Sequence, residues 1–101
     1  MALEKAADLS ELPAGTIREV QEGGKPVALA NVGGTIYAIN GTCLHRGGPL
    51  GQGVLEGTVV TCPWHGWQFD VITGTAVMNP NAGVGCLRTE VRGSEVYVDP
   101  T

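Results

Sequence analysis

The chain has 101 residues, enough for one domain, and carries a formal net charge of −4 with only six basic residues. Nucleic-acid binding depends on Lys and Arg neutralising phosphates, so this composition argues against a nucleic-acid partner. No apolar run approaches the roughly 20 residues that span a bilayer, and the start MALEK lacks the basic and apolar parts of a secretory leader. We therefore expect a cytoplasmic protein without membrane attachment.

Turn signals divide the chain into many short candidate strands. Residues 3–12 can hold a single helical turn before PAG stops it. Strands are predicted at 16–20 and 26–32, then at 35–39 after a Gly-Gly turn, and later at 58–61 and 67–71. Residues 40–57 and 78–85 are predicted as loops, and two last strands, 87–91 and 95–98, flank the turn RGS. The pattern indicates an all-β fold with one domain.

Each of the two histidines in the chain lies close to a cysteine. Cys43 and His45 form a C-x-H pair, Cys62 and His65 form a C-x-x-H pair, and residues 46–61 separate them. Three cysteines, an odd number, are not typical of a disulfide-stapled secreted domain and point instead to metal binding. Zinc accepts Cys₂His₂, but its usual spacings pair Cys with Cys and His with His. The mixed order suits a dinuclear iron cluster in which two histidines replace two cysteines on one iron.

The segments CLHRGGPL and CPWHGWQFD, within residues 43–74, resemble the Rieske [2Fe–2S] domain. The resemblance implies a Rieske-type fold: a small antiparallel β-sandwich or barrel base, residues 1–40 and 81–101, and a cluster-binding subdomain of two loops at about 41–80. It implies one [2Fe–2S] cluster, with Cys43 and Cys62 on the inner iron and His45 and His65 on the outer iron. Pro80 is expected to cover the cluster from a third loop.

Two differences from the high-potential members of the family indicate a low reduction potential. The resemblance places the two disulfide cysteines of those members at Gly48 and Trp64, so the disulfide is absent here. The resemblance also places the Ser and Tyr of those members, whose hydroxyls donate hydrogen bonds to the cluster sulfurs, at Trp67 and Phe69. Hydrogen bonds to the sulfurs stabilise the added electron, so we expect a potential of roughly −150 mV, the lower end of the Rieske range.

The expected function is one-electron transfer without catalysis. An oxygenase needs a further mononuclear iron site with two histidines, and this chain has none left over. The resemblance is therefore to the ferredoxin that passes electrons from a flavin-dependent reductase to a terminal ring-hydroxylating oxygenase. Two alternatives stay open: a Rieske-like small subunit of a larger reductase, such as a nitrite reductase, and a structural zinc module that binds other proteins.

The remaining residues near the motifs have more modest expected roles. Loop glycines are expected to bring backbone N–H groups close to the cluster sulfurs; they are Gly47, Gly48, Gly51 and Gly53. Trp67 is expected in the core, and Trp64 either shields the cluster or lies on a docking face. Cys86 has no histidine partner in sequence and is expected to be a small apolar residue near a strand. With few charges between residues 41 and 80, the cluster tip should be neutral, and Pro49 and Leu50 should lie near it.

Overall fold

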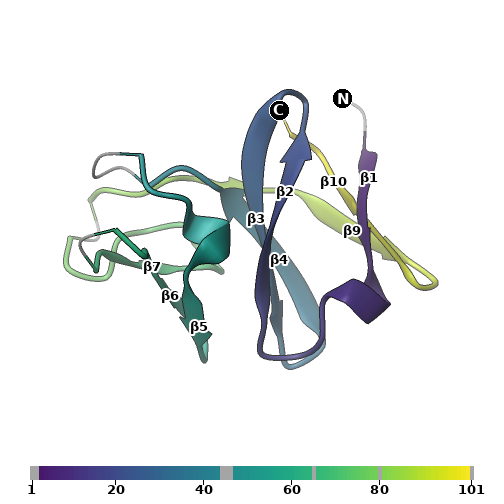
Figure 1. The fold of residues 1–101 in the computed structure, drawn as a ribbon, viewed down its shortest axis with the longest axis horizontal. Helices are drawn as coiled ribbons and strands as arrows, with labels where there is room; N and C mark the ends of the chain where they lie inside the picture. Colours follow the sequence, from purple (N-terminus) through teal and green to yellow (C-terminus); the bar gives the residue numbers. More distant parts are fainter. Residues whose placement is uncertain (1–2, 44–46, 65, 80, 101) are drawn as a thin grey trace.

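The computed structural model describes residues 3–43, 47–64, 66–79 and 81–100. Within these residues the chain forms ten strands and two short 3-10 helices, η1 (Leu9–Glu11) and η2 (Leu50–Gln52). The strands are arranged in three antiparallel sheets, seen side by side in Figure 1. No helix among the described residues is long and apolar enough to cross a bilayer. The predicted all-β fold is confirmed.

The central sheet has the order β2-β3-β4-β8, with β2 at Ile17–Glu22, β3 at Lys25–Val32, β4 at Thr35–Asn40 and β8 at Cys86–Leu87. Gly33 and Gly34 have positive φ in the turn between β3 and β4, which explains the Gly-Gly signal. Strand β3 is buried over residues 27–31 because its alternate side chains enter two different hydrophobic cores. Val27 and Leu29 belong to one core, and Ala28 and Ala30 belong to the other.

The second sheet has the order β1-β10-β9, with β1 at Glu4–Asp8, β9 at Thr89–Arg92 and β10 at Glu95–Val98. The single helical turn predicted within residues 3–12 is present as Leu9–Glu11, but strand β1, which precedes it, was not predicted. Antiparallel pairing of β1 with β10, almost ninety residues later, overrides the local preference. Ala7, Val96 and Val98 from this sheet are buried in the core that holds Val27 and Leu29.

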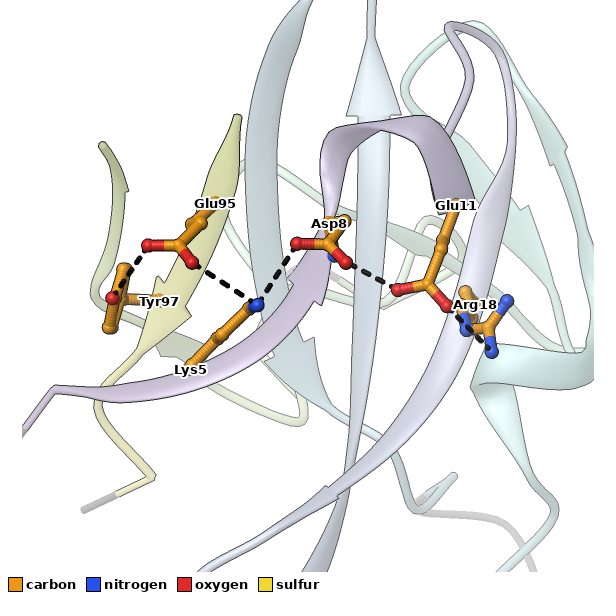
Figure 2. A network of polar contacts seen from close by, with 6 residues as sticks. All are labelled: Lys5, Asp8, Glu11, Arg18, Glu95 and Tyr97. Carbon is orange, nitrogen blue, oxygen red and sulfur yellow. Dashed lines mark hydrogen bonds and ion pairs between the residues drawn. The ribbon is translucent and has the colours of Figure 1, made fainter. Parts of the chain in front are cut away.

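Polar contacts fasten β1 to its neighbours, as Figure 2 shows. The ammonium of Lys5 lies 3.1 Å from Asp8 Oδ1 and 3.2 Å from Glu95 Oε2. The hydrogen bond to Asp8, followed by that to Glu95, raises the pKa of Lys5. Because these side chains are nearly half exposed, the ion pairs favour the observed register more than they add to stability.

The third sheet, β5-β6-β7, lies apart from the other two, on the left in Figure 1. Its strands are β5 (Val54–Glu56), β6 (Val59–Thr61) and β7 (Gln68–Asp70). Strand β5 falls in a segment predicted to be loop, and it forms by pairing with β6 across a turn at Gly57. Val60 and Phe69 are paired across β6 and β7, and both are fully buried. This sheet and the central sheet contribute to the hydrophobic core that contains Cys43 and Cys62.

Candidate metal centre

The structure brings Cys43 and Cys62 into one hydrophobic core from two separate loops. Cys43 follows β4, Cys62 follows β6, and each residue is only 2% exposed. Neither takes part in a disulfide. Their proposed partners His45 and His65 lie outside the described residues, as do Leu44, Arg46 and Pro80. Among the described residues, no group of three His, Cys, Asp or Glu side chains is arranged so that it could hold a metal ion. The ligand set of Cys43, His45, Cys62 and His65 therefore stays a prediction.

Backbone hydrogen bonds shape the loop that carries Cys43. The N–H of Leu50 donates to the carbonyl of Gly41 at 2.9 Å, and residues 42 and 49 form an isolated bridge. Inside this closure the N–H of Cys43 donates to the carbonyl of Gly48 at 2.8 Å, and the N–H of Gly47 donates to the carbonyl of Cys43 at 3.0 Å. Residues 47 and 48 therefore lie beside Cys43.

The loop that carries Cys62 is closed in the same way. The N–H of Cys62 donates to the carbonyl of Trp67 at 2.7 Å. The N–H of Trp64 donates to the Sγ of Cys62 at 3.4 Å. Donation of this kind favours a thiolate, the form of cysteine that binds metal. The sequence signal for Trp64 is Pro63, which lacks an N–H and makes the backbone N–H of Trp64 the first donor after the cysteine.

The two loops meet at Gly48. A Cβ built on Gly48 would lie 2.6 Å from Cys62 Sγ and 3.1 Å from the Cβ of Trp64. The positions that the resemblance assigns to the disulfide of the high-potential members are therefore in contact here, without a covalent bond. The N–H of Gly53 donates to the carbonyl of Leu50 at 3.0 Å rather than to a sulfur. At Gly51 an added Cβ would meet Glu19 on β2, so glycine allows close packing there.

Trp67 and Phe69 form an aromatic pair behind the cysteines. Their ring centroids lie 6.3 Å apart with an interplanar angle of 30°. Phe69 is fully buried, and Trp67 is half-buried against the core that contains both cysteines, as predicted. Neither side chain carries a hydroxyl that could reach a cluster sulfur, consistent with a low potential.

Four other residues lie near the motifs. Leu50 is fully buried in the core that contains both cysteines, so it lies near the centre but not at the surface. Trp64 is 49% exposed, and Cys86 is exposed on β8, where it pairs with Ile39 rather than lying in the core. Asp70 caps its own turn, accepting the N–H of Ile72 at 2.8 Å.

Fold and site together define a small β-protein in which two converging loops each bring a buried thiol into one hydrophobic core. A family model described as the Rieske [2Fe–2S] domain matches residues 3–90. The chain therefore belongs to the Rieske [2Fe–2S] domain family. The buried cysteine pair and the N–H donor on Cys62 Sγ fit such a cluster.

Known relatives narrow the class to ferredoxins. The chain is 40% identical over 96 residues to ferredoxin CarAc of Metapseudomonas resinovorans, covering 93% of this chain and 90% of that one. It matches the solved ferredoxin of carbazole 1,9a-dioxygenase from Nocardioides aromaticivorans IC177 over the whole of both chains, with a TM-score of 0.91 and 28% identity. A solved complex of reduced oxygenase and oxidised ferredoxin in carbazole 1,9a-dioxygenase also matches, with a TM-score of 0.86 and 39% identity over 95% of this chain and 91% of the matched chain.

The protein is thus an electron carrier that binds one Rieske [2Fe–2S] cluster, a ferredoxin of the kind found in ring-hydroxylating dioxygenase systems. The near-complete coverage of stand-alone ferredoxins favours this class over the small subunit of a larger reductase. It also favours iron over a structural zinc module.

Proposed function

We propose that the chain accepts one electron from a flavin-dependent ferredoxin reductase and passes it to a terminal ring-hydroxylating oxygenase in the cytoplasm. In this proposal Cys43 and Cys62 hold the inner iron, and His45 and His65 hold the outer iron. The observation that carries it is the burial of two cysteines in one core, each delivered by a loop that also carries a histidine in sequence.

The proposal assigns separate roles to two parts of the single domain. Residues 41–80 form the cluster-binding subdomain, and residues 1–40 and 81–101 form the base. In support, all of the sheet β5-β6-β7 comes from within residues 41–80. The base holds the second core, around Leu29, Val96 and Val98, and keeps the first loop attached to the end of β4.

When bound, the cluster supplies one-electron redox chemistry without an acid, base or nucleophile from the protein. The chain's own residues bind it and set its surroundings. Cys43 and Cys62 are withdrawn from water, Trp64 donates its N–H to Cys62 Sγ, and Trp67 and Phe69 offer no hydroxyl. A potential low in the Rieske range follows from this environment.

The acceptor is inferred from the solved oxygenase–ferredoxin complex that this chain resembles. The partner can be tested with purified reductase and oxygenase components of a carbazole dioxygenase system. We expect reduction of the ferredoxin only when the reductase is present, and reoxidation when the oxygenase and its substrate are added. A ferredoxin that is reduced but never reoxidised by any such oxygenase would contradict the proposed acceptor.

The ligand set is tested by His65→Cys, with Cys86→Ser as the matched control. The wild type should contain iron and acid-labile sulfide and give a Rieske EPR signal after reduction. His65→Cys should change that signal and lower the potential, because a thiolate adds negative charge to the centre. Cys86 is exposed on β8, so its variant should match the wild type. A His65→Cys spectrum identical to the wild type would remove His65 from the ligand set.

A further inference from the structure

We propose that Gly48 is a positioning residue of the iron–sulfur centre. Its missing side chain sets how closely the two cysteine loops approach, and it seats Trp64 so that the Trp64 N–H stays on Cys62 Sγ. The inference rests on the proposed function, in which Cys43 and Cys62 hold one iron.

Gly48 contacts both cysteine loops at once. Its carbonyl accepts the N–H of Cys43 at 2.8 Å, which ties it to the first cysteine. A Cβ on its other side would lie 2.6 Å from Cys62 Sγ, below the 3.0 Å that real Cβ contacts respect. The backbone of Gly48 therefore contacts the first cysteine through its carbonyl and lies beside the Sγ of the second.

Glycine is required at position 48 because there is no room for a side chain, and not because of the backbone conformation. Gly47 has a φ of +69°, where any side chain is strained, but Gly48 lies outside the positive-φ region. The backbone φ at Gly48 therefore does not itself demand glycine, and the three nearest atoms that an added Cβ would meet belong to Cys62 and Trp64. A substitution here reports on that contact directly.

Trp64 packs against Gly48 on the side where a side chain would project. The Cβ and Cγ of Trp64 would each lie 3.1 Å from a Cβ at Gly48, tighter than nine in ten such contacts. This packing holds the Cβ of Trp64, and the backbone N–H of the same residue donates to Cys62 Sγ. A hydrogen bond to a ligand sulfur stabilises the reduced centre and raises its potential.

A methyl group at position 48 should weaken that hydrogen bond. With the Sγ of Cys62 bound to iron, the strain would fall on Trp64 or on the loop around residue 48. Displacement of Trp64 would lengthen the contact between its backbone N–H and the sulfur. The reduced state then loses stabilisation, and the potential becomes more negative.

The test measures the reduction potential and EPR spectrum of the holoprotein for Gly48→Ala. Gly57→Ala is the control, because Gly57 has a φ of +61° and an added Cβ meets no atom within 4 Å. We expect Gly48→Ala to shift the potential to a more negative value and to change the EPR g values. Gly57→Ala should lower thermal stability and leave the potential unchanged. A Gly48→Ala protein with wild-type potential and spectrum would overturn the proposal.

A double-mutant cycle with Trp64→Ala isolates the Gly48–Trp64 contact. Trp64→Ala removes the indole and its Cγ contact but keeps the Cβ and the backbone N–H, so the shift of the double variant should be smaller than the sum of the two single shifts. Additive shifts in potential would refute the Trp64 contact as the cause. If Gly48→Ala folds without a cluster while Gly57→Ala keeps it, the proposal is supported; loss of the cluster from both variants would overturn it. Wild-type protein without iron and sulfide would instead refute the ligand set.

Discussion

The side-chain amide of Asn31 donates a hydrogen bond to the carbonyl of Leu12 at 2.8 Å, and both residues are buried. The Oδ1 of the same Asn31 accepts the N–H of Gly34 at 2.8 Å. One side chain in β3 is therefore hydrogen-bonded both to the segment that follows η1 and to the turn that leads into β4. The strand that feeds both hydrophobic cores is thus fixed in place at its end.

Asn31→Ala should destabilise the fold. It leaves the buried carbonyl of Leu12 without this donor, and an unsatisfied buried polar group costs about 1–3 kcal/mol. We expect chemical denaturation to show a loss of that size in the free energy of unfolding. Gln21→Ala removes an exposed amide from β2 and should change the free energy by less than about 0.5 kcal/mol. Equal effects of the two variants would show that the Asn31 contacts do not support the fold.

A second prediction concerns the pH dependence of stability. Burial, followed by a hydrogen bond with Glu4, raises the pKa of Glu22 in the folded state. A carboxyl with a raised pKa binds its proton more readily when folded, so it lowers stability as the pH rises above its unfolded value. Glu22→Gln should therefore raise the melting temperature at pH 7. The gain in the free energy of unfolding should be less than about 1 kcal/mol, because Glu4 and Glu22 lie near the surface.

The advantage of Glu22→Gln should disappear below about pH 4, where Glu22 is protonated in both states. Glu56→Gln, which removes the charge of an exposed carboxylate on β5, is the matched control for the loss of one negative charge. Thermal melts of the wild type and both variants across pH 3–8 would measure how the stability difference changes with pH. A stability gain that is independent of pH would contradict the mechanism.

The reduction potential gives a third prediction. Voltammetry should place the wild type at roughly −150 mV. Phe69→Tyr should raise the potential, because a hydroxyl at this position can donate to a cluster sulfur and stabilise the added electron. Tyr37→Phe removes a hydroxyl from another side chain that packs against the same core and should leave the potential unchanged. A wild-type potential near the upper, positive end of the range would refute the assignment to the low-potential members.

The parts of the fold that sequence predicts are those that local signals determine. The hairpin of β3 and β4 follows from a run of apolar residues on each side of Gly33 and Gly34, and the structure confirms it. Strand β1 could not be predicted, because its pairing with β10 is a contact between the two ends of the sequence. Strand β5 has three residues in a Gly-rich segment and is defined only by its partner β6.

The candidate site shows the same division. The spacing of Cys43 and Cys62 within their motifs indicated convergence, and the structure places both in one core. The hydrogen bond from the Trp64 N–H and the close approach of Gly48 could not be read from spacing, because they depend on how two separate loops pack together. His45 and His65 lie outside the described residues, so their part in the site stays a prediction.

A final prediction compares two valines on neighbouring strands. Val60 on β6 is fully buried beside the cysteines, whereas Val54 on β5 is 61% exposed. Val60→Ala should lower the free energy of unfolding by about 1–3 kcal/mol, since it removes buried methyl groups and leaves a cavity. It should also speed the loss of iron on incubation with a chelator, because the cavity adjoins the core that holds both thiols. Val54→Ala should change stability by less than about 0.5 kcal/mol. If both variants lose iron at the wild-type rate, packing of this core does not control retention of the cluster.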